Sequence, residues 1–220
     1  MAEQATPQRD QATTLRSLNR AADSGRATRV LSVTSGKGGV GKTAVVANLA
    51  VLLSRMGQRV LILDADLGLA NIDVVFGLAP NHNLNHFFSG EQSLEAILVE
   101  GPEGIRILPA GSGVQRFTRL DSEQKMQLLE ALDGMHNEFD FVLIDTEAGI
   151  SENVTYFNTA AQEILVVTTP EPTAITDAYA LMKLLSNQFH EKHFNLIVNF
   201  IRNEEEALDV YRKLTMVANR

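Results

Sequence analysis

Residues 36–43 read GKGGVGKT and match the spacing of a phosphate-binding loop, G-x-x-x-x-G-K-[ST]. Glycines let successive backbone N–H groups point toward an anion, which a Cβ would obstruct. The ammonium of Lys42 is placed for the β- and γ-phosphates of a nucleotide, and the hydroxyl of Thr43 for a Mg²⁺ ion. The motif therefore predicts binding of a nucleoside triphosphate with Mg²⁺.

Carboxylates follow two apolar segments outside this loop. Asp145 ends the segment 139–144, where the acid of a P-loop protein is expected to hold Mg²⁺ through a water. Asp64 and Asp66 follow the apolar segment 59–63. These two carboxylates could take part in phosphoryl transfer, but aspartates at strand ends also favour turns without any ligand, so both roles stay open for this pair. Phosphoryl transfer needs mostly positioning and charge neutralisation, so the carboxylates of Asp64 and Asp66 together with the two lysines of the loop, Lys37 and Lys42, would be sufficient for it.

The loop and the acids need elements to position them, and the chain alternates apolar strand patterns with helix patterns. Such alternation predicts an α/β fold, a mostly parallel sheet with helices on both faces, of the P-loop NTPase type. Ligands of such sheets bind at the carboxyl ends of strands, so the loop, the three aspartates and Asn199 are expected in one site. We expect strands at 29–34, 59–64, 104–109, 139–145, 163–168 and 194–199, and helices at 43–53, 121–132 and 173–188. Irregular segments and short helices, one of them at 93–98, are expected over 66–100. A last helix should pack one apolar face on the core, formed by Ala207, Val210, Tyr211, Leu214 and Val217.

Composition limits the possible classes. The 220 residues are 45% hydrophobic, which favours one α/β domain, assigned here to 29–220, after a polar tail at 1–28 with one short helix. The net charge of −8, without a basic run, argues against strong nucleic-acid binding. The absence of cysteine excludes cysteine-ligated iron–sulfur and zinc sites and fits a cytoplasmic protein. No apolar run approaches the roughly 20 residues of a membrane span.

A second lysine, Lys37, lies inside the loop, too far round it to duplicate the role of Lys42. The string 37–43 resembles the deviant Walker A family of MinD, ParA and their relatives. The resemblance implies ATP as the nucleotide, slow hydrolysis and a homodimer in the ATP state, in which Lys37 reaches the partner's phosphates. It also implies that Asp66 orients the attacking water, that Asp64 supports the Mg²⁺ shell, and that Asn199 contacts the adenine. Asparagine also favours turns without any ligand, so this alternative stays open for Asn199.

The expected site combines these assignments. Catalysis is assigned to Lys37, Lys42 and Asp66, and metal binding to Thr43, Asp64 and Asp145. The nucleotide is expected to contact Gly36, Lys37, Gly38, Gly39, Val40, Gly41, Lys42, Thr43, Ala44 and Asn199. Residues 145–149 resemble the family's switch II, but Glu147 stands where a small residue or proline is expected. A carboxylate there would repel the γ-phosphate unless it points away.

Two further stretches resemble one subgroup, the flagellar-number regulators of the FlhG (FleN) type. They are residues 10–16, which read DQATTLR, and residues 171–180. In that subgroup the N-terminal segment stimulates FlhF, a signal-recognition-type GTPase, and the ATP cycle governs contacts with flagellar regulators. We therefore expect Gln11, Leu15 and Arg16 to contact an FlhF-type partner; a disordered tail without a partner is the alternative.

The family continues past residue 220 into a membrane-targeting helix, so we expect the ATPase domain to lack its C-terminal end and not to bind membranes as given. The longer protein is expected in the cytoplasm, with peripheral association at the inner membrane or the cell pole. Three other functions remain open: a ParA-type partitioning ATPase, a MinD-type division-site ATPase, and a metabolic P-loop ligase or kinase.

Overall fold

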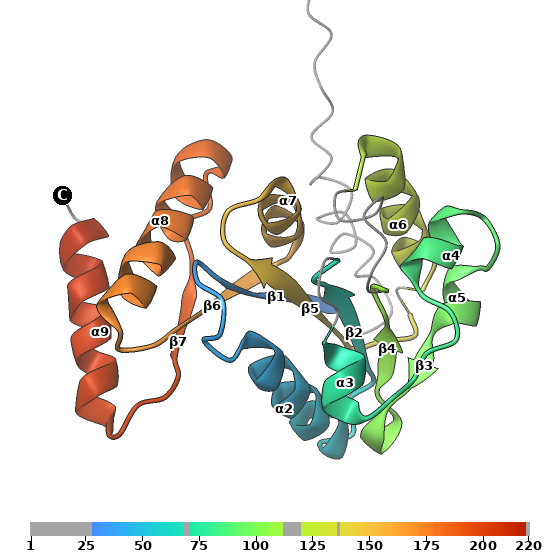
Figure 1. Cartoon of the computed structure of the whole chain (residues 1–220), viewed down its shortest axis with the longest axis horizontal. Helices are drawn as coiled ribbons and strands as arrows, with labels where there is room; N and C mark the ends of the chain where they lie inside the picture. The colour runs from blue at the N-terminus through green and yellow to red at the C-terminus, as the bar shows by residue number, and fades with distance from the viewer. Residues whose placement is uncertain (1–27, 68–70, 112–119, 136, 219–220) are drawn as a thin grey trace, which may run out of the picture.

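A computed structural model describes residues 28–67, 71–111, 120–135 and 137–218, in which strands and helices alternate along the chain (Figure 1). The strands are β1 (Arg29–Ser35), β2 (Val60–Ala65), β3 (Val99–Glu100), β4 (Arg106–Leu108), β5 (Phe141–Ala148), β6 (Glu163–Thr168) and β7 (Asn195–Val198). The helices are α2 (Lys42–Arg55), α3 (Ile72–Phe76), α4 (Leu84–Phe88), α5 (Leu94–Ile97), α6 (Ser122–Gly134), α7 (Glu152–Ala160), α8 (Pro172–Phe189) and α9 (Glu204–Ala218), with a 3₁₀ turn at Pro102–Gly104.

The strands form one sheet in the order β3-β4-β2-β5-β1-β6-β7. Every pairing is parallel except that of β3 with β4 at one edge. In the register of β2 with β5, Asp64 lies beside Asp145, and in that of β1 with β5, Ser35 lies beside Ala148. The predicted parallel sheet is confirmed, and its register brings the acids and the phosphate-binding loop together at the carboxyl ends of the central strands.

Helices cover both faces of the sheet: α2 and α3 lie on one face, and α6, α7 and α8 on the other (Figure 1). Successive strand residues alternate between these layers, because side chains of a strand point to opposite faces. Leu61 and Leu63 belong to the core under α6, whereas Val60 and Ile62 belong to the core over α2. Burial on both faces explains why these strands read as continuous apolar runs.

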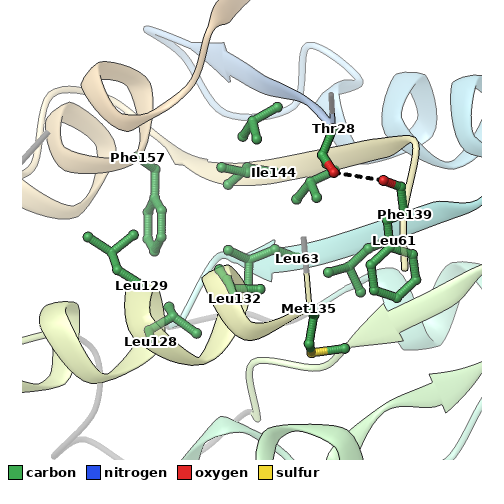
Figure 2. A pocket seen from close by; sticks show the side chains of 12 residues that line it. Thr28, Leu61, Leu63, Leu128, Leu129, Leu132, Met135, Phe139, Ile144 and Phe157 are labelled. Carbon is green, nitrogen blue, oxygen red and sulfur yellow. Dashed lines mark hydrogen bonds between the residues drawn. The ribbon is translucent and has the colours of Figure 1, made fainter. Parts of the chain in front are cut away.

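A small cavity lies between α6 and the sheet, and the side chains around it are almost all apolar (Figure 2). Its volume is about 30 Å³. Thr28 is the polar exception, and its hydroxyl donates to the carbonyl of Phe139 at 2.8 Å. Apolar cavities of this kind stay dry, so this one is a packing feature of the core, and a single threonine hydroxyl does not supply the polar groups that a nucleotide needs.

Two elements and one surface differ from the prediction. No sequence pattern indicated β3 or α7. In α7 the side chain of Asn158 is buried: its amide N–H groups donate to the Val154 carbonyl and the Thr34 hydroxyl, and its oxygen accepts from the Ser32 hydroxyl. In α9, Val210 and Leu214 are buried as expected, but Tyr211 is 56% exposed and Val217 43% exposed. The apolar face of α9 is therefore only partly covered. None of the described helices is long and apolar enough to span a bilayer.

Candidate functional site

The phosphate-binding loop joins the carboxyl end of β1 to the first turn of α2. Helix α2 begins at Lys42, and Gly41 before it has a φ of 93°. Gly39 has a φ of 78°, also in the left-handed region that glycine tolerates best. The loop therefore delivers backbone N–H groups at a helix N-terminus, where the dipole and the free donors favour an anion.

Neighbouring segments fix the shape of this loop by close approach. A Cβ at Gly36 would lie 2.1 Å from the carbonyl oxygen of Asp177 in α8, so only glycine fits there. A Cβ at Gly41 would lie 2.4 Å from Nδ2 of Asn199. That amide donates to the carbonyl of Val40 at 3.0 Å and so ties the end of β7 to the loop. Asn199 thus reaches the site as a support of the loop, and its contact with adenine stays a prediction.

Lys42, Asp64 and Asp145 form a buried cluster at the base of the loop, with 9%, 1% and 2% of their surfaces exposed. Burial lowers the pKa of Lys42, and the carboxylates of Asp145, Asp66 and Glu147 partly offset this effect. Burial, and then the neighbouring Asp145 carboxylate, raise the pKa of Asp64 to about 7. The charged groups are held close together in a dry environment, where charges interact strongly.

Asp64 is also bound to the backbone around it. Its Oδ1 accepts from the N–H of Asp66 at 3.2 Å, and its Oδ2 accepts from the N–H groups of Asn71 at 3.1 Å and Ile72 at 3.3 Å. One carboxylate therefore anchors both ends of the segment that follows β2, and it holds the start of α3. This geometry fits a supporting role behind a metal ion, as expected from the sequence.

Asp145 has an oxygen suited to a cation. Its Oδ1 is buried and has no hydrogen-bond partner among the described residues. Burial raises the pKa of Asp145 to about 6, although the hydroxyl of Thr43 and the ammonium of Lys42 lower it. A hard cation would satisfy the free oxygen and favour the charged carboxylate. Asp145 and Thr43 therefore fit a Mg²⁺ site, with Asp64 behind it.

Asp66, half-buried, lies on the same edge of the sheet. Its carboxylate is near enough to raise the pKa values of both Lys42 and Asp145. The structure thus brings Lys42 and Asp66, which are predicted for catalysis, close to the residues predicted for Mg²⁺, which are Thr43, Asp64 and Asp145. Gln11, Leu15 and Arg16 lie outside the described residues.

Lys37 is held differently from Lys42. Its ammonium donates to Oε2 of Glu171 at 2.7 Å and to the hydroxyl of Thr173 at 3.0 Å. The Lys37 side chain is 37% exposed and that of Glu171 is 66% exposed. The sequence analysis did not predict that Glu171 and Thr173 contact Lys37. The only local signal was Pro172, which marks the first turn of α8 and so places both residues at the start of that helix. We call Lys37, Glu147 and Glu171 the rim of the site.

Glu147 belongs to the rim because it lies beyond the buried part of β5 and affects Lys42 electrostatically. Its Oε1 accepts a hydrogen bond from the hydroxyl of Ser151. Ser151 is the N-cap of α7, and its Oγ accepts from the N–H of Val154 at 3.2 Å. Gly149, with a φ of 103°, lets its N–H donate to the carbonyl of Ser35 at 2.9 Å. Residues 145–149, which resemble switch II, are therefore hydrogen-bonded to the strand that leads into the phosphate-binding loop.

Similarity to known proteins agrees with this geometry. Residues 28–198 match a family model described as an AAA domain. The chain is 45% identical over 192 residues to the antiactivator FleN of Pseudomonas aeruginosa, and the match covers 87% of this chain and 69% of FleN. The chain belongs to the MinD/ParA family of P-loop ATPases.

Other members of the MinD/ParA family support this assignment. The flagellum site-determining protein YlxH of Helicobacter pylori is 37% identical, over 87% of this chain and 64% of that protein. The solved structure of the septum site-determining protein MinD from Pyrococcus horikoshii, in complex with Mg-ADP, is 32% identical with a TM-score of 0.64. The match covers 83% of this chain and 77% of the MinD chain. The chain is thus an ATPase of this family and spans roughly two thirds of FleN and YlxH.

Proposed function

We propose that this chain is an ATP-dependent dimerisation switch with slow ATP hydrolysis. Lys37 carries the proposal. A lysine that only bound the nucleotide of its own chain would have no reason to lie at the exposed rim, hydrogen-bonded to Glu171 and Thr173. Exposed ion pairs of this kind contribute little stability and exchange partners readily. In the dimer, Lys37 exchanges Glu171 for the phosphates of the partner's nucleotide.

The remaining residues divide the work of hydrolysis within one protomer. Lys42 and the loop amides bind the phosphates, and Asp66 orients the attacking water. Thr43 and Asp145 hold Mg²⁺, which supplies neutralisation of the phosphate charge when it is bound. Asp64 keeps Asp66 in place by accepting from its backbone N–H. Lys37 arrives only with the second protomer, so hydrolysis stays slow until the dimer forms.

The output of the switch is regulation of flagellar number or placement. This part rests on the similarity to YlxH, whose name describes flagellar site determination, and to FleN, named as an antiactivator. The dimer contacts flagellar regulators, and residues 10–16 stimulate an FlhF-type GTPase through Gln11, Leu15 and Arg16. The protein acts in the cytoplasm, with peripheral association at the inner membrane or the cell pole.

A MinD-type role in division-site selection is the second candidate, because MinD of P. horikoshii is 32% identical to the chain. A ParA-type partitioning ATPase differs in using DNA as its matrix. That function requires salt-sensitive DNA binding in the ATP state, which the net charge of −8 disfavours. A metabolic kinase or ligase would need an acceptor substrate for turnover and would leave Lys37 without a role.

Size-exclusion chromatography with ATP, with ADP and without nucleotide tests the switch. A dimer with ATP alone supports it, and a monomer in all three conditions contradicts it. A peptide of residues 1–28, added to an FlhF-type GTPase, tests the partner separately. Faster GTP hydrolysis, weakened by Gln11→Ala, supports the flagellar assignment. An unchanged rate at saturating peptide removes the FlhF-type partner and leaves the ATP switch intact.

A further inference from the structure

Glu147 poses an electrostatic problem for a protein that binds ATP. Its carboxylate lies in switch II, close enough to Lys42 to raise the pKa of that lysine. Lys42 is the residue that meets the terminal phosphates. A negative side chain in this position repels a γ-phosphate, and the repulsion is greater for ATP than for the shorter ADP.

The hydrogen bond from Ser151 determines where this carboxylate lies. The Ser151 hydroxyl donates to Oε1 of Glu147, and the bond draws the carboxylate toward the first turn of α7. A helix N-terminus favours negative charge, which adds to the effect of the bond. The same Oγ accepts from the N–H of Val154, so the hydroxyl is oriented from both sides.

We propose that Ser151 is a positioning residue, which holds the Glu147 carboxylate against the start of α7 and so keeps it away from the terminal phosphate of ATP. Switch II can then carry a glutamate without excluding the triphosphate. The inference rests on the proposed function, because it assumes that this chain binds ATP as its switching ligand. It predicts that releasing Glu147 harms ATP binding selectively and leaves ADP binding unchanged.

The test is calorimetric titration of the whole chain with Mg-ATP and with Mg-ADP. Ser151→Gly removes the hydroxyl, and glycine remains an acceptable N-cap, so α7 should persist. We expect ATP affinity to fall about threefold to fivefold, the range of an exposed charge interaction, with ADP affinity unchanged. Ser151→Thr keeps a hydroxyl and should bind both nucleotides as the unmodified chain does.

The double variant decides whether charge is the cause. Adding Glu147→Gln to Ser151→Gly removes the freed charge and should restore ATP affinity. Equal weakening of ATP and ADP, an unchanged ATP affinity in Ser151→Gly, or a double variant that stays weak would each overturn the inference and leave the proposed switch standing. A wild-type chain that binds ADP but never ATP would overturn both together.

Discussion

The buried cluster and the rim lie on the same edge of the sheet, but their charges are held in different ways. Lys42, Asp64 and Asp145 are almost fully enclosed, and their pKa values are shifted by burial. Lys37, Glu147 and Glu171 are held by hydrogen bonds that solvent can reach. The buried cluster is preorganised for one ligand, whereas each rim contact can be exchanged for another at small cost.

Binding and switching are therefore separable in this molecule. Removal of a group in the buried cluster should abolish nucleotide or metal binding, because these groups are proposed to bind the phosphates and Mg²⁺ or to support the metal site. Removal of a rim group should leave nucleotide binding nearly intact and change only dimerisation and hydrolysis. Variants in the two regions provide a direct test, and their effects are expected to differ in size.

The largest effect is expected for Lys42→Ala in the buried cluster. Loss of the charge-assisted phosphate contact should weaken Mg-ATP binding by about 100-fold or more. Calorimetric titration measures the affinity, and thermal unfolding checks that the variant remains folded. Near-normal ATP affinity in a folded variant would mean that this loop is not the phosphate site.

Asp66→Ala should keep ATP bound and lower the rate of hydrolysis by about 100-fold, since the group that orients the water is lost. The ATP-bound dimer should accumulate as a result. Single-turnover hydrolysis and chromatography of the same sample measure both effects. Normal turnover would transfer the role to another residue, and Asp64 would be the first to examine.

Lys37→Ala is the decisive rim variant. ATP affinity should stay within about twofold of the unmodified chain, because the lost contacts are exposed ones. The ATP-dependent dimer and hydrolysis should both disappear. Chromatography with ATP gives the result, and a dimer as abundant as that of the wild type would make Lys37 an ordinary surface residue.

Asp145→Asn should stabilise the protein free of nucleotide and metal as the pH rises. The folded-state pKa of Asp145, about 6, lies above the ordinary value of 3.8, so its contribution to stability is complete below pH 3.8 and is lost as the pH rises through 6. Asparagine stays neutral, so at pH 8 its free energy of unfolding should be higher by roughly 1–3 kcal/mol. Denaturant melts at pH 8 and pH 4 with chelator measure this, and an equal difference at both pH values would contradict it.

The smallest effect is expected for Glu171→Gln, which weakens the ion pair that holds Lys37 within its own chain. Because Lys37 is then free to reach the partner's phosphates, the proportion of ATP-bound dimer should rise by about twofold, which corresponds to the small free energy of an exposed ion pair. Glu103→Gln is a matched control, since it breaks the exposed pair of Arg55 with Glu103 outside the site. A fall in dimer with Glu171→Gln would mean that Glu171 assists Lys37 in the dimer.

Prediction from the sequence succeeded where the physical cause is local. The phosphate-binding loop is a contiguous pattern, and Asp64 and Asp145 end apolar runs whose parallel pairing brings their carboxyl ends together. Helix α6 begins after Asp121, which forms a capping box with Gln124 and so has a local start signal. Strands β2 and β5 are neighbours in the sheet, and their register places Asp64 beside Asp145.

Prediction failed where distant residues or polar burial decide the structure. The partner of Lys37 is 134 positions away, and no pattern in the chain pairs the two. Helix α7 reads ENVTYFNTA, and its buried face mixes apolar Val154 and Phe157 with polar Asn158, which is buried through its hydrogen bonds and breaks the apolar pattern. The contact of Asn199 with adenine stays a prediction, but no sequence pattern indicated that its amide donates to the carbonyl of Val40, 159 positions away.

The close approach of Gly36 to Asp177 has a mechanical consequence. Because no side chain separates the two backbones there, the loop cannot shift without displacing the N-terminal part of α8. Helix α8 has 18 residues and is therefore a stiff rod about 27 Å long. Helix α9 packs against α8, and the exposed apolar residues of α9 include Tyr211. A shift of the phosphate-binding loop would therefore have to move α8 and, with it, the surface that α8 shares with α9.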